Sequence, residues 1–256
     1  QDVIILYTFI KSCLIEKKIM TNQIIQGDCL EVMKDIPDGS VDMILADLPY
    51  GTTACKWDTI IPFEPLWKQY KRIIKDNGAI VLTASQPFTT KLIDSNIYDF
   101  RYEIIWEKEQ ATNFMMLKKQ IGKSHENILI FYKSQPSFNP QMVKSNKSIR
   151  SCGGNKVETY GGFNAVGNTE IRYEKYPCSI LRINRDKDGL HPTQKPVALF
   201  EYLIKTYTNE GDLVLDNCAG SGTTGVACQN LNRNYILIEK EQEYIDIINK
   251  RLANND

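Results

Sequence analysis

A glycine-rich stretch near the carboxyl end of the chain carries the residues best suited to binding a cofactor. The sequence LVLDNCAGSGTTG places Gly220, Gly222 and Gly225 in the spacing G-x-G-x-x-G, between an apolar run and a helical pattern. Glu239 ends the next apolar run, 23 residues after Asp216 (239 − 216). Glycines let the backbone approach a ligand closely, and an acid at the next strand end accepts hydrogen bonds from ribose hydroxyls. The unit therefore predicts a site for an adenosine cofactor, with a purely structural glycine turn as the alternative.

The cofactor that best suits this unit is S-adenosylmethionine. A P-loop would need a lysine directly after its last glycine, and none is present. Asp216 stands at the strand tip before the glycines, where its charge would repel a pyrophosphate but attract an ammonium or sulfonium group. Only one more predicted strand follows, whereas an NAD-binding fold would need its remaining strands there. An NAD-dependent oxidoreductase is the alternative from a different class.

A second stretch, LADLPYGT, closes an apolar run with Asp47, Leu48, Pro49 and Tyr50. Asp and Pro are common turn residues, so a simple turn at the end of a strand is one interpretation. A connecting loop needs only residues such as Gly, Asn and Ser. The carboxylate, the proline and the aromatic ring together therefore indicate a role beyond turning the chain.

Both stretches follow apolar runs that alternate with helical patterns. The predicted strands are 22–28, 41–47, 79–85, 100–108, 125–133, 212–217 and 234–240. The predicted helices are 29–36, 63–75, 87–95, 195–208, 223–231 and 241–252. Continuous apolar strands that alternate with helices are typical of a parallel sheet covered on both faces. We therefore expect an α/β fold with a seven-stranded, mostly parallel sheet and helices on both faces.

The alternating pattern fails between residues 134 and 190, which are rich in Ser, Asn, Gly, Pro and Lys. We expect a loop-rich insertion there, between 20–133 and 191–256, and an N-terminal extension over 1–19. Residues 108–187 contain 14 Lys or Arg and 6 Asp or Glu, a net charge of 14 − 6 = +8, although the whole chain is neutral. A basic middle region suits a polyanionic partner, with a solvated Lys-rich insertion as the alternative.

The composition argues against several other classes. Seven scattered cysteines, no C-x-x-C spacing and only two histidines argue against a zinc site and a disulfide framework, so no metal is expected. We expect reduced thiols, as in a cytoplasmic protein. No apolar run approaches the roughly 18 residues of a membrane span, so we expect no membrane partner.

Three stretches, DLPY, HPTQKP and DNCAGSGTT, resemble in type and order the motifs of β-class amino-group DNA methyltransferases, over residues 22–252. The resemblance implies a Rossmann-like methyltransferase fold, S-adenosylmethionine as cofactor and double-stranded DNA as substrate. It makes 20–133 the catalytic half, 134–190 the target recognition region and 191–256 the cofactor-binding half.

In this family the DLPY stretch would be catalytic. Asp47 and the carbonyl of Leu48 would accept hydrogen bonds from the exocyclic amino group of the target base. Pro49 would fix the turn, and Tyr50 would stack on the flipped-out base. Transfer would then be direct, with positioning supplying most of the rate. The commonest form has proline in both middle positions, so Leu48 is a departure. A leading Asp favours adenine N6, with cytosine N4 as the alternative acceptor.

The resemblance also implies a set of cofactor contacts. They are Asp28, Thr193, Lys195, Asp216, Cys218, Gly220, Ser221, Gly222, Thr223, Thr224 and Glu239. Some of these have a structural alternative. Asp28, expected near the cofactor adenine, would equally cap the following helix, and Thr223 and Thr224 would cap another. The HPTQKP stretch would equally be a proline-bounded helix start.

The expected DNA contacts lie in the basic region. The phosphate-contact candidates are Lys118, Lys119, Lys144, Lys147 and Arg150. Trp106 and Phe114 flank the expected target pocket, where either would hold the base, although core packing is the simpler role for Trp106. His125 and Glu126 match a recurrent family stretch without a distinct chemical role. Family habit also suggests a homodimer and a cognate restriction endonuclease as partners.

Two further alternatives use other features of the sequence. Pro177-Cys178 resembles the nucleophile dipeptide of cytosine-C5 methyltransferases, which attack carbon with a thiolate. Its place between the DLPY and glycine-rich stretches is wrong for that class, and the other motifs of the class are missing. A non-catalytic DNA-binding module would retain the basic region but transfer no methyl group.

Overall fold

The computed structural model describes most of the chain. The described residues are 21–53, 55, 58–150, 171–186 and 194–254, with the backbone alone for 146–150 and 171–172. The expected extension 1–19 lies outside them. The chain forms two compact units: one runs up to Phe138 and resumes at Ile180, and the other is Asn139–Ser179.

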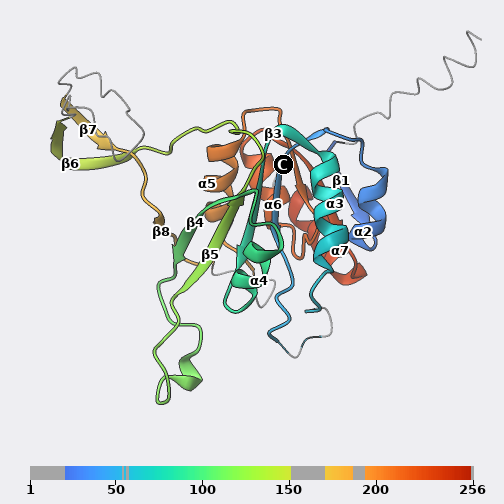
Figure 1. Ribbon diagram of the computed structural model, residues 1–256, viewed down its shortest axis with the longest axis horizontal. Coiled ribbons are helices and arrows are strands. Elements are labelled where there is room, and N and C mark those ends of the chain that lie inside the picture. Colours follow the sequence, from blue (N-terminus) through green and yellow to red (C-terminus); the bar gives the residue numbers. More distant parts are fainter. Residues whose placement is uncertain (1–20, 54, 56–57, 151–170, 187–193, 255–256) are drawn as a thin grey trace, which may run out of the picture. The chain divides into compact units, whose positions relative to one another are not determined.

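The first unit is built on one eight-stranded sheet (Figure 1). Its strands, in spatial order, are β1 (Gln23–Gln26), β10 (Asn234–Glu239), β9 (Leu213–Asp216), β2 (Val41–Asp47), β3 (Ile74–Ala84), β5 (His125–Phe131), β4 (Phe100–Glu107) and β8 (Ile180–Arg182). Neighbouring strands are parallel except that β5 runs antiparallel to both β3 and β4. The mostly parallel α/β fold is confirmed, and the carboxyl ends of all strands except β5 lie at one edge.

Helices cover both faces of this sheet. On one face lie α2 (Cys29–Val32), η1 (Met33–Asp35), α3 (Phe63–Ile73) and α4 (Phe88–Ser95); on the other lie α5 (Val197–Tyr207), α6 (Thr223–Asn230) and α7 (Gln242–Ala253). Alternate residues of β2 point to opposite faces, as a strand requires. Met43 and Leu45 pack with the α5–α7 core, whereas Ile44 and Ala46 pack with the α2–α4 core. Both faces are buried, which explains the continuous apolar run in this strand.

The sheet has one strand more than expected. All seven predicted strands are present, and β8 adds an eighth at the edge beside β4. Within 139–179, β6 (Val143–Arg150) and β7 (Ile171–Lys175) form a two-stranded antiparallel sheet, although no strand was expected there. Strands β6 and β7 lack apolar runs, and β8 is only three residues long. The sequence therefore shows no strand-type alternation of apolar and polar residues at any of the three. The functional roles of the expected segments remain predictions.

None of the helices in the described parts of the chain combines the length and the apolar character that a membrane crossing requires.

One buried hydrogen bond ties α3 to the end of β9. The hydroxyl of Tyr70 donates to Oδ1 of Asn217 at 2.5 Å, and both residues are buried. Asn217 directly follows the last residue of β9, so this bond anchors the loop that carries the glycine-rich stretch. A buried acceptor that loses its donor costs free energy because water cannot replace the bond.

We predict that Tyr70→Phe lowers the free energy of unfolding by about 1–3 kcal/mol, because it leaves the Asn217 carbonyl oxygen unpaired. Tyr98→Phe is the matched control, since the Tyr98 side chain is exposed. Urea unfolding of both variants tests this. Equal losses of stability in the two variants would contradict the assigned role of the bond.

Candidate active site

Three carboxylates converge at the carboxyl edge of the sheet. Strand β2 ends at Asp47, β9 at Asp216 and β10 at Glu239, and β2 pairs in parallel with β9. Ligands of open α/β sheets bind in the crevice outside this edge. The three side chains line one cavity of about 830 Å³, within the usual range for small-molecule sites. The fold therefore joins the two chemically notable stretches into a single site.

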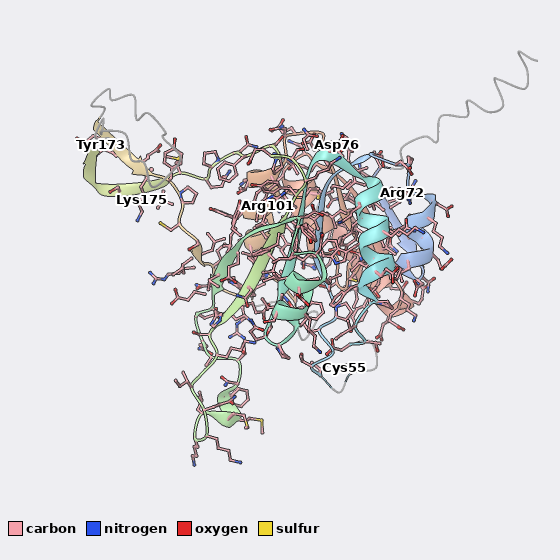
Figure 2. The ribbon with its side chains drawn as sticks, in the orientation of Figure 1. Cys55, Arg72, Asp76, Arg101, Tyr173 and Lys175 are labelled. Carbon is pink, nitrogen blue, oxygen red and sulfur yellow. The ribbon has the colours of Figure 1, made fainter. Side chains whose placement is uncertain are left out.

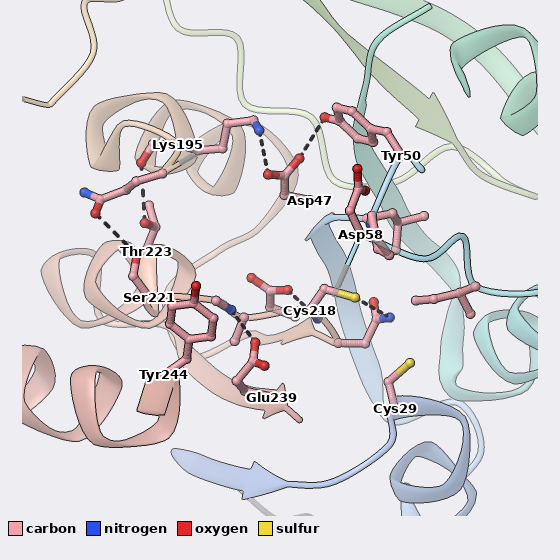
Figure 3. A pocket seen from close by; sticks show the side chains of 18 of the residues that line it. Cys29, Asp47, Tyr50, Asp58, Lys195, Cys218, Ser221, Thr223, Glu239 and Tyr244 are labelled. Carbon is pink, nitrogen blue, oxygen red and sulfur yellow. Dashed lines mark hydrogen bonds and ion pairs between the residues drawn. The ribbon is translucent and has the colours of Figure 1, made fainter. Parts of the chain in front are cut away.

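The Asp47 carboxylate is held from two sides (Figure 3). Its Oδ1 accepts hydrogen bonds from the hydroxyls of Tyr50, at 2.7 Å, and Thr83. Its Oδ2 accepts one from Nζ of Lys195 at 2.5 Å. A carboxylate offers about four acceptor positions, and the described residues use three. One position on Oδ2 therefore remains for a donor that enters the cavity.

A row of alternating charges lies behind Asp47. Lys195 contacts both Asp47 and Glu126, with 3.3 Å between its Nζ and Glu126 Oε2, and Glu126 in turn pairs with Lys108. Burial would lower the pKa of Lys195, but the two carboxylates outweigh burial and raise it. Burial likewise acts to raise the pKa of Glu126, but Lys195 and Lys108 outweigh it and hold the pKa low. The row therefore keeps Lys195 as an ammonium beside Asp47.

Aromatic packing and a loop carboxylate fix the segment after Asp47. The Tyr50 ring stacks on Phe88 with 5.2 Å between ring centroids and an interplanar angle of 26°. Asp58 is buried, and its carboxylate accepts hydrogen bonds from the backbone N–H groups of Gly51, Thr52 and Thr53 at 2.7–2.8 Å. Burial acts to raise the pKa of Asp58, but a hydrogen bond from the Thr53 hydroxyl and these backbone hydrogen bonds outweigh it and lower the pKa. The turn is therefore preorganised. The sequence did not predict that Asp58 would hold it.

The glycine-rich loop is fastened to the end of β10. Oε2 of Glu239 accepts from the N–H of Gly220 at 2.8 Å, while its Oε1 accepts from the N–H groups of Lys240 and Glu241. Gly220 and Gly222 have φ angles of 51° and 82°, which favour glycine. The fold thus brings Glu239 beside the glycines, as the spacing predicted.

Asp216 is a buried carboxylate with no ion-pair partner among the described side chains. Thr224 and the N–H of Cys218 donate to it. Burial, together with the charges of the neighbouring Asp47 and Glu239, outweighs these hydrogen bonds and raises its pKa to about 7. A cation that enters the cavity would supply the missing charge partner. The site therefore fits a cofactor that carries a sulfonium or ammonium group.

The cavity collects most of the predicted site residues. Those that line it are Asp28, Asp47, Leu48, Pro49, Tyr50, Lys195, Asp216, Cys218, Gly220, Ser221, Thr223 and Glu239. Asp28 also caps α2, because its Oδ1 accepts from the N–H of Leu30 at 2.9 Å. Gly222 and Thr224 do not line the cavity: Gly222 lies close to Ile248, and Thr224 is fully buried against Asp216. Thr193 lies outside the described residues.

The remaining predicted residues are spread more widely. Lys118 and Lys119 are exposed between β4 and β5, Phe114 is exposed nearby, and Lys144 is exposed on β6. Lys147 and Arg150 also lie on β6, but their side chains are outside the described parts. His125, at the start of β5, is exposed. Trp106 is buried, donates to the carbonyl of Ile183 at 2.8 Å and lines the cavity.

Sequence reasoning missed several contacts at the site. Thr83 and Asp58 were not singled out, Glu126 had no assigned role, and Lys195 was expected at the cofactor but pairs with Asp47. Of these residues, Thr83 could have been found from the sequence, because it is a polar residue inside the apolar strand AIVLTAS. Among the described residues, no cluster of three or more His, Cys, Asp or Glu could hold a metal ion.

Comparison with known families gives one match over most of the chain. A family model of the N6/N4 type, described as DNA methylase, matches residues 41–250. The Type II methyltransferase M.HinfI of Haemophilus influenzae is 30% identical, over 90% of this chain and 68% of that protein. The DNA adenine methyltransferase YhdJ of Escherichia coli (strain K12) is 31% identical, over 90% of this chain and 82% of that protein.

Solved structures share the architecture. The complex of M1.HpyAVI with SAM superposes with a TM-score of 0.63 at 27% identity, over 90% of this chain and 99% of that chain. The PvuII DNA methyltransferase, described as cytosine-N4-specific, gives a TM-score of 0.64 at 16% identity, over 92% of this chain and 91% of that chain, and so shares the fold alone.

The raised pKa of Asp216 predicts a specific dependence of stability on pH. An ordinary aspartate titrates near 4, so between about pH 4 and pH 7 the folded protein binds a proton that the unfolded chain lacks. The corresponding stabilisation is present below about pH 4 and is lost as the pH rises through 7. Asp216→Asn should therefore gain stability relative to the wild type as the pH rises from 5 to 8. Urea unfolding at both pH values tests this, and a difference that does not change with pH would contradict it.

Proposed function

This chain belongs to the N6/N4 family of DNA methylases, and on that basis we propose that it methylates the exocyclic N6 of an adenine flipped out of double-stranded DNA. Its cofactor is S-adenosylmethionine, which supplies a methyl group activated on a sulfonium. The enzyme is therefore a DNA methyltransferase of the amino-group type. The observation that carries the proposal is that Asp47 lines the cavity together with the cofactor residues and Tyr50, and keeps one acceptor position that no described side chain uses.

Methyl transfer to an exocyclic amino group requires a hydrogen-bond acceptor beside that group. The amino nitrogen of a base is a poor nucleophile, because its lone pair is delocalised into the ring. A carboxylate that accepts one N–H bond, with the carbonyl of Leu48 accepting the other, shifts electron density to nitrogen and orients it. The nitrogen must also release a proton as it gains the methyl group, and Asp47 is positioned to take it. Tyr50, stacked on Phe88, offers an aromatic surface for the base.

The rest of the cavity suits the methyl donor. Glu239 lies at the strand end expected for an acid that binds ribose hydroxyls, and Asp216 has no positive partner in the described part of the chain. Asp28 lies at the adjoining strand end, where it would accept from an adenine amino group. These residues would hold the cofactor on the β9–β10 side and leave the β2 side for the target base.

Lys195 is proposed as a positioning residue for Asp47. Its ammonium neutralises part of the negative charge that Asp47 and Glu126 place in a buried region. Its hydrogen bond also fixes the direction in which Oδ2 presents its last acceptor position. Glu126 and Lys108 hold Lys195 in place from behind.

Adenine is favoured over cytosine by the leading Asp of DLPY and by the name of the YhdJ relative. The cytosine-N4 alternative is represented by the PvuII enzyme, whose likeness is one of fold. We further propose that the protein acts in the cytoplasm and that the Asn139–Ser179 unit, with Lys144, takes part in target recognition. A homodimer and a cognate restriction endonuclease remain proposals from the family resemblance.

Product identification tests the proposed reaction. The protein is incubated with mixed-sequence DNA and labelled S-adenosylmethionine, and the DNA is digested to nucleosides for mass analysis. We expect N6-methyl-2′-deoxyadenosine; N4-methyl-2′-deoxycytidine would overturn the choice of base, and no transfer would overturn the function. Asp47→Asn should lower transfer about a hundredfold or more while S-adenosylmethionine still binds. The control Asp76→Asn changes an exposed carboxylate and should transfer normally.

Replacing Lys195 tests its role in positioning Asp47. Lys195→Met removes the hydrogen bond to Oδ2 of Asp47, so kcat should fall about tenfold or more while the KM for S-adenosylmethionine changes little. Lys195→Arg should restore part of the wild-type kcat. Lys91→Met, an exposed lysine of α4, is the control. Equal losses of kcat and of S-adenosylmethionine affinity, with lower thermal stability, would show a structural role only.

A further inference from the structure

The connection between β4 and β5, residues 108–124, forms a finger that extends from the sheet (Figure 1). Glu107 pairs with His125 where the two strands meet the finger. Because β4 runs parallel to β2 and β9, with β5 reversed between β3 and β4, the finger leaves the sheet at the edge that carries Asp47 and Asp216. It therefore arises on the same side as the active site.

Backbone hydrogen bonds close the base of the finger. The N–H of Lys108 donates to the carbonyl of Ser124 at 2.7 Å, and that of Thr112 donates to the carbonyl of Lys123 at 2.9 Å. The N–H of Lys123 donates to Oδ1 of Asn113 at 2.6 Å. Beyond this neck, η2 (Phe114–Met116) turns the chain at the tip. The tip is thus presented on an ordered stem.

The tip exposes large apolar side chains. Phe114, Met115 and Ile121 are 71%, 83% and 93% exposed, and Met116 and Leu117 are also exposed. Figure 2 shows the side chains of the finger standing clear of the sheet. Lys118 and Lys119 lie among them, with no acidic residue between 113 and 122. A contiguous apolar surface of this kind marks an interaction site.

The base of the finger forms part of the cavity wall. Thr112 and Lys123 both line the cavity, and Nζ of Lys123 donates to Oγ of Ser85, which also lines it. The apolar tip lies between Thr112 and Lys123 in the chain. It is therefore tethered beside the cavity that would receive the base.

We propose that this finger is a wedge that enters duplex DNA beside the target base pair. Phe114, Met115 and Ile121 would insert between bases and fill the space that the extruded base leaves, while Lys118 and Lys119 bind the flanking phosphates. Apolar side chains that intercalate in this way offset the cost of unstacking. The proposal rests on the proposed function, because it assigns the tip to the same DNA substrate. The two lysines and the absence of acidic residues favour DNA over a second copy of this neutral chain.

The test compares two substrates that differ only in how firmly the target base is held. Once product mapping on the wild type has identified the methylated site, one duplex carries it fully paired and the other carries an abasic position opposite the target base. Phe114→Ala/Ile121→Ala should lower kcat/KM on the paired duplex about tenfold or more, and much less on the abasic duplex. The tip side chains are exposed, so thermal unfolding should match the wild type. Lys118→Ala/Lys119→Ala is the matched control. It should weaken the binding of both duplexes equally and reduce the salt dependence of binding.

Four results would overturn the wedge. The apolar variant could lose equal activity on both duplexes, or none on either. Alternatively, the wild type could form a dimer in solution that the apolar variant cannot form, which would assign the tip to a second copy. If the wild type methylates no DNA, the proposed function fails first and the wedge fails with it. Wild-type transfer with an unaffected apolar variant would remove the wedge alone.

Discussion

The ion pair between Asp47 and Lys195 is the constraint on which the rest of the site depends. A carboxylate at the end of a buried strand loses hydration, so a positive partner is needed to offset that cost, yet the carboxylate must keep one acceptor position for the substrate. Lys195 supplies the positive charge through one hydrogen bond to Oδ2 and leaves the second acceptor position of Oδ2 unused. Tyr50 and Thr83 both donate to Oδ1. Glu126 and Lys108 balance Lys195 in turn, so four charged groups sum to zero behind the reacting position.

The topology of the sheet makes this arrangement available. Adjacent parallel strands β2 and β9 come from distant parts of the chain, yet they end side by side and place Asp47 and Asp216 at one edge. The two carboxylates have different partners: Asp47 has an ammonium, whereas among the described residues Asp216 has only a hydroxyl and a backbone N–H. That contrast divides the cavity into a side that accepts a neutral amino group and a side that attracts a cation. The finger between β4 and β5 arises from the same edge.

The sequence predicted those features that follow from local patterns. Apolar runs located seven strands, and the glycines, Asp216 and Glu239 were placed together because they occupy successive strand ends. The resemblance of HPTQKP to a family stretch near the methionine end of the cofactor implies a cofactor contact for Lys195. Its bond to Asp47 spans 148 positions of sequence, so only tertiary packing could reveal it. The role of Asp58 and the presence of β8 could not be predicted from sequence patterns either. Asp58 acts by accepting hydrogen bonds from backbone N–H groups, which almost any residue type offers, and β8 is only three residues long.

The central claim is that Asp47 presents one acceptor position to an amino group of a base outside the duplex. A crystal structure of the protein with a target duplex and a non-transferring analogue of S-adenosylmethionine tests this most directly. The account predicts one extruded base whose exocyclic nitrogen lies within about 3.2 Å of Oδ2 of Asp47. A base that stays stacked in the duplex, or an amino group bound elsewhere while Asp47 contacts only Lys195, Tyr50 and Thr83, would contradict it.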